Sequence, residues 1–109
     1  MAYIPKRGDI IWTDFDPSSG HEQAKRRPAL VLSIEPFNKQ IKLALVAPIT
    51  STVRGHGFEV KLETTQTKGV VLCQQVKTID YLSRGADFIE KAPKPIVDQV
   101  LTIVRAIVD

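Results

Sequence analysis

The sequence has 109 residues, of which 43% are hydrophobic and 25% charged, and it carries a net charge of +3 at neutral pH. These values are typical of one globular domain, and we expect a single domain over residues 1–109. Cys73 is the sole cysteine, which excludes an intramolecular disulfide. No signal-peptide core is visible and no apolar run approaches the ~20 residues of a membrane span, so we expect a cytoplasmic protein with no membrane partner.

The first half of the chain is predicted to contain three strands. Each is a run of apolar residues that ends at a cluster of turn-forming residues. Pro28 suits the first position of the second strand, because that position needs no ladder donor. The predicted strands cover residues 9–15, 28–34 and 42–49, with turns at 16–20 and 35–39.

The second half is predicted to add two strands and a helix. Residues 58–62 alternate with a period of two, residues 70–77 form a longer apolar run, and residues 78–83 fit a single helical turn. Apolar residues in the tail then recur at three- and four-residue spacing, which predicts a helix over residues 95–108. We therefore expect a mainly β protein with five or more mostly antiparallel strands and a C-terminal α-helix packed on the sheet.

Positive charge is concentrated in the first half of the sequence. Residues 1–54 contain eight Lys and Arg against five Asp and Glu, whereas residues 55–109 contain seven of each kind. The surplus lies in the half that holds Lys25, Arg26 and Arg27, and it favours an anionic partner such as a nucleic acid.

The polar segment between the first two predicted strands has the residue types for RNA cleavage. Attack by the RNA's own 2′-hydroxyl needs a base, a cation that stabilises the phosphorane-like charge, and an acid for the leaving 5′ oxygen. Glu22 or His21 could be the base, and the guanidinium of Arg27 could hold the non-bridging oxygens. From composition alone, a solvated surface loop is the simpler interpretation of these residues.

Several short motifs follow one another along almost the whole chain. They are Gly8-Asp9-Ile10-Ile11-Trp12, Phe15-Asp16-Pro17, Gly20-His21-Glu22-Gln23, Arg27-Pro28-Ala29-Leu30-Val31-Leu32-Ser33, Phe37-Asn38, Val46-Ala47-Pro48-Ile49-Thr50-Ser51, Gly57-Phe58, Gly69-Val70-Val71, Gln75-Val76-Lys77-Thr78-Ile79-Asp80 and Arg84. Each motif alone is weak evidence. In this order and spacing, however, they resemble the MazF/PemK toxin family.

The resemblance implies a fold and an activity. It implies an SH3-like small barrel of the PemK/CcdB plasmid-toxin type, and a toxin of a type II toxin–antitoxin module. It also implies a sequence-specific, metal-independent endoribonuclease that cuts single-stranded RNA, often mRNA, and so inhibits translation and growth. Because the sequence shows no cluster of metal ligands and no cofactor motif, we expect the substrate's 2′-hydroxyl to be the nucleophile, which leaves 2′,3′-cyclic phosphate and 5′-hydroxyl ends.

The resemblance also assigns roles to individual residues. Glu22 and Arg27 fall on the family's acid/base pair, and His21 falls on a histidine that some members carry. Members often have Asp at the position of Gln74, and glutamine cannot accept a proton at neutral pH, so the expected base is Glu22 or His21. The predicted catalytic residues are Glu22, Arg27, His21 and Thr50, and the predicted RNA-binding residues are Ser51, Lys25, Arg26, Gln74, Gln75 and Lys77.

Two kinds of protein partner are expected. A homodimer would cover the apolar face of the helix over residues 95–108 together with part of the first strand, where Trp12 is a core or interface residue. A cognate MazE/PemI-like antitoxin would place a flexible, acidic C-terminal part against Lys25, Arg26 and Arg27.

Two other classes of protein compete with the ribonuclease. A CcdB-like toxin would inhibit DNA gyrase on the same fold, but such toxins end in Trp and lack the Glu22/Arg27 signature, whereas this chain ends in Asp109. A plain SH3-like binding module would need an aromatic-rich groove, which the scattered aromatic residues do not suggest. Single residues also have plainer interpretations: Thr50-Ser51 as a strand-ending turn, Gln74 and Gln75 as solvent-facing polar residues, and Cys73 as a small core residue.

Overall fold

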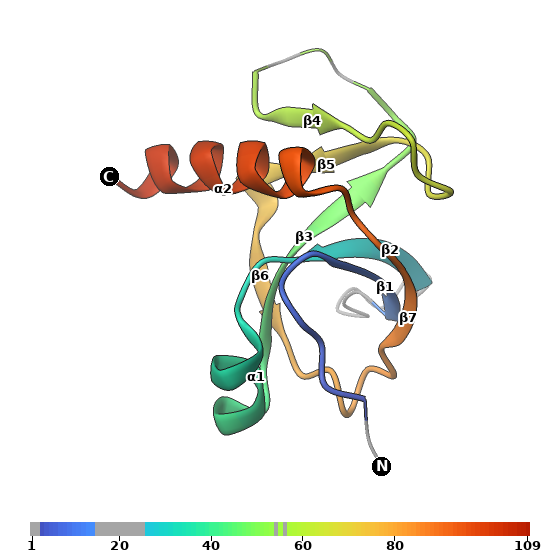
Figure 1. The fold of residues 1–109 in the computed structure, drawn as a ribbon, viewed down its shortest axis with the longest axis vertical. Coiled ribbons are helices and arrows are strands. Elements are labelled where there is room, and N and C mark those ends of the chain that lie inside the picture. Colours follow the sequence, from blue (N-terminus) through green and yellow to red (C-terminus); the bar gives the residue numbers. More distant parts are fainter. Residues whose placement is uncertain (1–2, 15–25, 54, 56) are drawn as a thin grey trace, which may run out of the picture.

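Seven antiparallel strands form the central sheet of the computed structural model, which describes residues 3–14, 26–53, 55 and 57–109. The strands lie in the order β4-β5-β3-β2-β1-β7, and β6 pairs with β3 (Figure 1). The elements are β1 (Asp9–Asp14), β2 (Arg26–Val31), α1 (Glu35–Ile41), β3 (Ala44–Thr50), β4 (Glu59–Lys61), β5 (Val70–Leu72), the 3-10 turn η1 (Cys73–Gln75), β6 (Lys77–Ile79), β7 (Asp87–Lys91) and α2 (Lys94–Val108).

Apolar residues are buried on both faces of the sheet. Because neighbouring residues in a strand point to opposite faces, Ile10 and Leu30 face one side while Ile11 and Ala29 face the other. One cluster lies between the sheet and α2, and Cys73 belongs to it as a fully buried residue, as predicted. The other cluster is smaller and is centred on Ile11, Ala29, Val31, Ala44, Val46, Ile79 and Tyr81.

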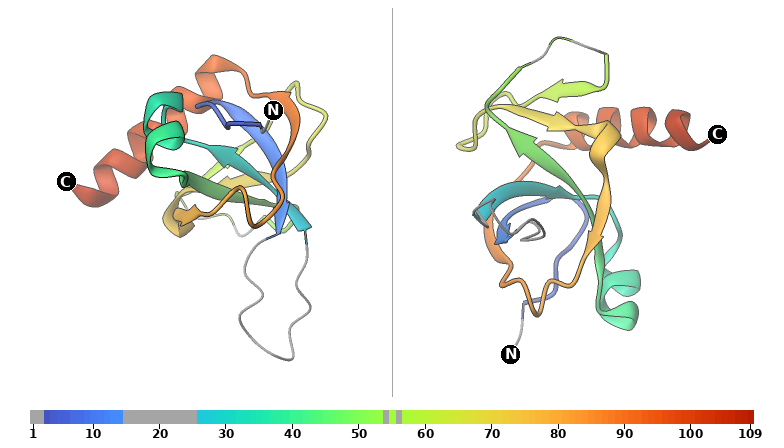
Figure 2. Two further views of the ribbon diagram at one scale, coloured as in Figure 1. Left: turned by 90° about the horizontal axis from the view of Figure 1, so that it is seen from below. Right: turned by 180° about the vertical axis from the view of Figure 1, so that it is seen from behind.

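The C-terminal helix α2 forms where the apolar periodicity predicted it. Pro93 is its N-cap residue and Pro95 lies in its first turn, where a missing N–H leaves no helical hydrogen bond unmade. The first turns bury Ile96, Val97 and Val100 against the sheet, whereas the second half of α2 extends past the strands (Figure 2). Within the part of the chain that the structure describes, neither helix is long and apolar enough to cross a bilayer.

The segment predicted as a turn at residues 35–39 is instead the short helix α1, so that prediction was wrong. Within this seven-residue helix the buried residue is the polar Asn38, whereas the apolar Phe37 and Ile41 are exposed, so no apolar helical period is visible. Asn38 is fully buried, and its side-chain amide donates hydrogen bonds to the carbonyls of Pro5 (2.8 Å) and Ser33 (3.1 Å). Tertiary hydrogen bonds of this kind stabilise a helix that is too short to form in isolation.

The predicted strand over residues 70–77 is broken in two, and the predicted helical turn at 78–83 begins as strand. β5 pairs with the end of β3 and β6 pairs with its beginning. Between these two ladders the register against β3 shifts by three residues, which is the length of η1. The 3-10 turn therefore takes up the extra chain as β5 and β6 follow the twisted β3.

The edge strand β7 was not predicted at all. It pairs with β1, with an irregularity in the register between Ile10 and Ile11. Phe88 on β7 is 52% exposed, and the strand's buried and exposed positions do not alternate cleanly. Strands are predicted from an alternation of apolar and polar residues, and β7 lacks this alternation.

Candidate active site

A polar hollow of about 330 Å³ lies where β2 begins and β3 ends. Ala29 pairs with Pro48, and continuing this antiparallel register by two residues brings Arg27 across from Thr50. The hollow contains two cationic side chains and two hydroxyls, which together form a receptor for an anion. Its lining residues are Arg27, Pro28, Ile49, Thr50, Ser51 and Lys68.

Arg27 lies on the exposed side of this hollow. Among residues 3–14, 26–53, 55 and 57–109, no carboxylate pairs with its guanidinium, so its donors face the hollow and solvent. Its cross-strand partner on β1 is Thr13, which is fully buried. The Thr13 hydroxyl has no hydrogen-bond partner among the residues that the structure describes, which is unusual for a buried polar atom.

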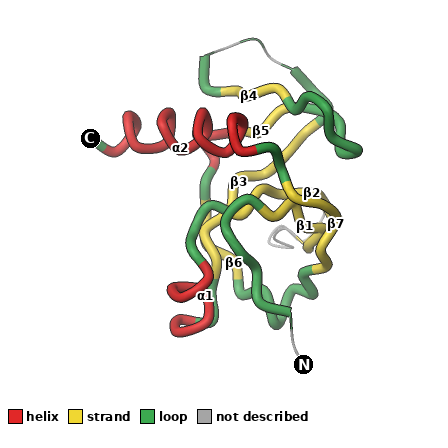
Figure 3. Tube along the Cα trace, viewed as in Figure 1, coloured by secondary structure: helices red, strands yellow, loops and turns green. Residues whose placement is uncertain are grey.

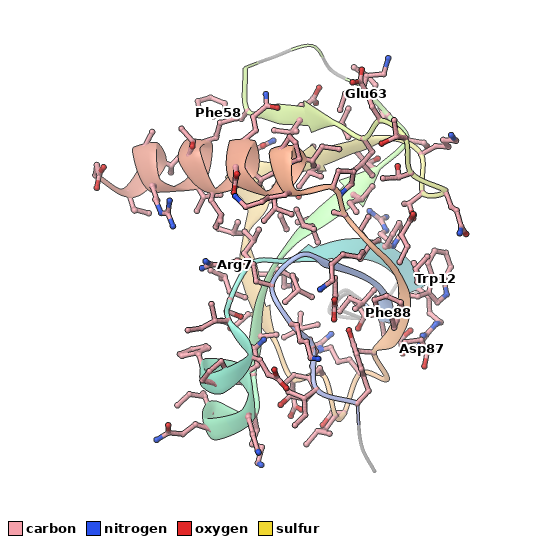
Figure 4. The ribbon with its side chains drawn as sticks, in the orientation of Figure 1. Arg7, Trp12, Phe58, Glu63, Asp87 and Phe88 are labelled. Atoms are coloured by element: carbon pink, nitrogen blue, oxygen red, sulfur yellow. The ribbon has the colours of Figure 1, made fainter. Side chains whose placement is uncertain are left out.

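Arg26, the next residue, is engaged within the protein. Its Nη2 is 2.7 Å from Asp87 Oδ2 and donates to the carbonyls of Trp12 (3.1 Å) and Gly85 (2.9 Å), while Nη1 is 3.4 Å from Asp14 Oδ1. Trp12 and Asp87 accordingly lie on the same side of the molecule (Figure 4). Arg26 thus links β2 to β1 and β7, and fewer of its donors remain for RNA than the sequence suggested.

Trp12 lies beside this linkage and is 40% exposed. Trp12 is therefore not a core residue, and the prediction that it could belong to the core is wrong. The backbone of Trp12 belongs to an interior strand of the sheet, because β1 lies between β2 and β7. The residue is nevertheless exposed to solvent.

Thr50 is the last residue of β3 and Ser51 follows it, and both lie against the loop that leads into β5. The backbone N–H of Thr52 donates to Thr50 Oγ1 (3.2 Å), so the Thr50 hydroxyl can still donate its own proton to a ligand. Gly69 contacts this corner directly: a Cβ added there would lie 2.2 Å from the Thr50 carbonyl oxygen. Only a glycine fits this close approach.

Lys68 completes the hollow, and sequence reasoning missed it. Its Nζ donates to the carbonyl of Thr65 (3.1 Å) in the loop between β4 and β5. This loop lies beside the end of β3 (Figure 3), because β5 starts where it pairs with Thr50. Only the pairing of these two strands could have revealed Lys68, and no local motif marks it.

Glu90 on β7 anchors the same loop. Its Oε1 accepts from the Gln66 N–H (3.0 Å), and its Oε2 accepts from the N–H (2.7 Å) and the hydroxyl (2.8 Å) of Thr67. Partial burial disfavours the charged form of Glu90. The hydrogen bonds from Gln66 and Thr67, helped by the nearby charge of Lys68, outweigh this effect and hold the pKa of Glu90 below its usual value.

The remaining predicted residues lie elsewhere. Gln74 and Gln75 are exposed on η1, and Lys77 begins β6. Since Val70 pairs with Thr50 and η1 follows at the other end of β5, these residues are on the order of 10 Å from the hollow. His21, Glu22 and Lys25 lie outside the described residues.

No three His, Cys, Asp or Glu side chains converge into a cluster that could bind a metal ion, as far as the described ranges extend. The hollow itself contains cations and hydroxyls, which suit the oxygens of an anion rather than a metal ion.

Comparison with known proteins identifies the family. Residues 6–108 match the family described as PemK-like, MazF-like toxin of type II toxin-antitoxin system. The chain belongs to this toxin family. The match covers nearly the whole chain, including β1, the hollow and α2.

Relatives of this MazF-like toxin are endoribonucleases. It is 46% identical over 84 residues to the endoribonuclease toxin MazF of Escherichia coli strain K12, covering 77% of this chain and 76% of the relative. It is 44% identical over 110 aligned positions to the endoribonuclease toxin ChpB of the same strain, covering 95% and 94% of the two chains. The chain is therefore a MazF-like endoribonuclease toxin, and the ribonuclease hypothesis is confirmed over the gyrase inhibitor and the binding module.

Solved structures of MazF proteins have the same fold. A MazE–MazF crystal structure from Deinococcus radiodurans matches this toxin with a TM-score of 0.91 and 36% identity over 98% of this chain and 97% of that chain. A crystal structure of MazF from the same organism gives a TM-score of 0.89, also at 36% identity, with 98% of each chain covered. The predicted mainly antiparallel β fold with a C-terminal helix is confirmed.

Proposed function

We propose that this MazF-like toxin cleaves single-stranded RNA, mRNA included, with the scissile phosphate bound in the hollow at Arg27 and Thr50. The observation that carries the proposal is that one cavity of about 330 Å³ is lined by hydroxyl donors and by a guanidinium that pairs with no carboxylate of the described residues. Such a cavity binds tetrahedral oxyanions by charge-assisted hydrogen bonds. The protein would act in the cytoplasm, where its RNA substrate is, and would inhibit translation and growth.

The chemistry follows from the groups around the phosphate. The 2′-oxygen attacks phosphorus while its proton passes to a base, the P–O5′ bond breaks, and the 5′ oxygen receives a proton. Arg27 stabilises the negative charge that develops on the non-bridging oxygens, and the Thr50 hydroxyl donates to one of them. The products are a 2′,3′-cyclic phosphate and a 5′-hydroxyl, and no metal or other cofactor takes part.

Glu22 is the proposed base, with His21 as the alternative base or the acid. Both belong to residues 15–25, which the structure does not describe, so their support is the family resemblance and the chemistry of their side chains. A glutamate has a reference pKa of ~4.3 and a histidine ~6.5, so histidine is better matched to proton transfer at neutral pH.

The rest of the RNA would follow the surface around the hollow. Ser51 lines the hollow and is exposed, and Lys25 and Arg26 belong to the basic segment before Arg27. Gln74, Gln75 and Lys77 would contact nucleotides further along the strand. We expect sequence specificity to arise from such contacts to bases rather than from the phosphate itself.

We also propose a homodimer formed through the outer half of α2. An apolar hollow of about 490 Å³ lies on one side of this half, against Phe37 and Leu45, and another of about 450 Å³ lies on the other side, against Phe58. Phe58 and Arg7, which belong to these two hollows, lie on opposite sides of α2 (Figure 4). Ile107 and Val108 are 45% and 76% exposed, and such an apolar surface favours association.

A MazE/PemI-like antitoxin is the second proposed partner. Its support is that solved relatives include MazE–MazF complexes. A flexible acidic C-terminal part would neutralise Lys25, Arg26 and Arg27, and would therefore compete with RNA for the hollow.

The chemistry is tested by metal removal and by substrate substitution. We expect cleavage of a short single-stranded RNA to persist in excess EDTA, and to stop when the 2′-oxygen at the cut is methylated. Mass spectrometry should find a 2′,3′-cyclic phosphate, or the 3′-phosphate after its hydrolysis, opposite a 5′-hydroxyl. Loss of cleavage in EDTA, or cutting of the methylated RNA, would overturn the mechanism.

A further inference from the structure

We propose that Lys68 is a second cationic ligand of the RNA backbone, presented to the scissile phosphate or its neighbour by a loop that Glu90 holds in place. This inference rests on the proposed function, because it takes the hollow to be the phosphate site. Lys68 would bind the RNA before and during the reaction, whereas Arg27 stabilises the transition state. Glu90 would be a positioning residue that acts through the loop and does not touch RNA.

The ammonium group of Lys68 can donate further hydrogen bonds at the hollow. This group carries three N–H donors, and the structure assigns one of them, to the carbonyl of Thr65. That hydrogen bond holds the side chain against its own loop, and Lys68 lines the cavity together with residues from the ends of β2 and β3. Within the described residues, two donors therefore remain for phosphate oxygens.

The loop that carries Lys68 is unusually well held. Glu90 accepts three hydrogen bonds from Gln66 and Thr67, and the Thr65 hydroxyl donates to the Thr67 carbonyl (2.6 Å) from a nearly buried position. Thr64 has a left-handed backbone with φ of 61°. A non-glycine residue keeps this conformation only where its surroundings enforce it.

The loop is also fixed relative to the other side of the hollow. Gly69, the residue after Lys68, lies against the Thr50 carbonyl without room for a Cβ. The backbones of Lys68 and Thr50 are therefore held close together, and ligand binding does not have to order either backbone. Preorganisation of this kind lowers the entropic cost of binding.

Phosphate is the group that this arrangement fits. Lys68 is an exposed point charge with no planar geometry to read a base edge, so its contact should be independent of RNA sequence. A lysine that neutralises one phosphate contributes about 0.7 to the slope of log K against log salt for a single strand. This slope distinguishes a direct phosphate contact from a general effect on folding.

The test compares Lys68→Gln with a matched control, Lys39→Gln. Lys39 is an exposed lysine on α1, and it does not line the hollow. Binding of a non-cleavable 2′-O-methyl RNA is measured at several salt concentrations, so the result does not depend on the cleavage chemistry. We expect Lys68→Gln to weaken binding several-fold and to reduce the salt slope by about 0.7, with Lys68→Arg close to wild type and Lys39→Gln unchanged.

Kinetics and Glu90→Gln complete the test. Lys68→Gln should raise KM while kcat changes by less than about threefold, since the contact is made equally in the ground and transition states. Glu90→Gln should reproduce this pattern, and the double variant should be no worse than Lys68→Gln alone. Equal salt slopes for Lys68→Gln and wild type would overturn the inference, even if wild type cleaves RNA as proposed. A Glu90→Gln defect that adds fully to that of Lys68→Gln would overturn its positioning role.

Discussion

Gly69 and Thr50 are in backbone contact, so close that a Cβ on Gly69 would come within 2.2 Å of the Thr50 carbonyl oxygen. The φ of Gly69 is also 125°, a value that residues with side chains rarely adopt. This contact joins the end of β3 to the loop that carries Lys68, and so it sets the width of the candidate phosphate site.

Gly69→Ala should therefore damage both stability and activity. Backbone strain alone should lower the free energy of unfolding by about 1–3 kcal/mol. Displacement of Thr50 by even ~1 Å should reduce kcat/KM by up to about 10²-fold. Urea denaturation and cleavage of a fluorogenic RNA measure the two effects. Gly57→Ala is the matched control, because a Cβ at Gly57 meets no atom of the described residues within 4 Å. Equal behaviour of the two variants would contradict the prediction.

Arg27→Ala should remove the main stabilisation of charge in the transition state. Loss of such a donor typically costs about 10²–10³-fold in rate. Because Arg27 is exposed and makes no ion pair within the described residues, the variant should unfold at the wild-type denaturant concentration. Single-turnover cleavage rates give the measurement, with Arg27→Lys expected to recover only part of the activity. An Arg27→Ala rate near that of wild type would exclude this role.

Acid should weaken the hydrogen bonds by which Glu90 holds Gln66 and Thr67. The pKa of Glu90 is held below its ordinary 4.5, so the stabilisation is complete above that pH and is lost as the pH falls through the lower folded value. Glu90→Gln should thus be less stable than wild type at pH 7, and the difference should shrink below pH 4.5. Chemical denaturation over pH 3–8 tests this, and a difference independent of pH would contradict it.

Thr13→Val should stabilise the protein. The Thr13 hydroxyl is buried without a partner in the described part of the chain, and an unsatisfied polar group of this kind costs about 1–3 kcal/mol. Valine keeps the shape and removes the unpaired atom, so the midpoint of thermal unfolding should rise. A lower midpoint would mean that the hydroxyl finds a partner that the described residues do not include. Thr102→Val, at an exposed position of α2, serves as the comparison.

Cys73 should be unreactive in the folded toxin. Burial raises the pKa of its thiol to about 11, so only about 10⁻⁴ of it is thiolate at pH 7. A thiol reagent should modify it only after denaturation, with no loss of activity under native conditions. Rapid labelling of the native protein, followed by mass spectrometry, would show that this side of the core opens readily.

The elements with a regular apolar period could be predicted from the sequence, and those held by tertiary contacts could not. The helix at Lys94–Val108 has a long apolar stripe, and the strands around Ile11 and Leu30 are apolar on both faces. By contrast, α1 depends on the buried Asn38, and β7 is recognisable only through its pairing with β1. Neither dependence leaves a periodic signal in the sequence.

The candidate site was predictable in part for a similar reason. Arg27, Thr50 and Ser51 fall within family motifs, and the β2–β3 pairing brings them together. Lys68 and Glu90 belong to no such motif. Lys68 reaches the hollow only through the pairing of β5 with β3, and Glu90 reaches the loop that carries Lys68 only through the position of β7 at the edge of the sheet. The engagement of Arg26 by Asp87 likewise joins residues from opposite ends of the chain.

The pairing of β1 with β7 determines when the protein can fold during its own synthesis. Trp12 is made early and pairs with Asp87, which is made late, and α2 must follow before the larger apolar cluster is covered. Contacts between segments so distant in the chain cannot form on a partly made polypeptide. The loop with Lys68 also stays unanchored until Glu90 has been added. We therefore expect the growing chain to be inert toward the message from which it is being translated, and to become a nuclease only after β7 and α2 have been made.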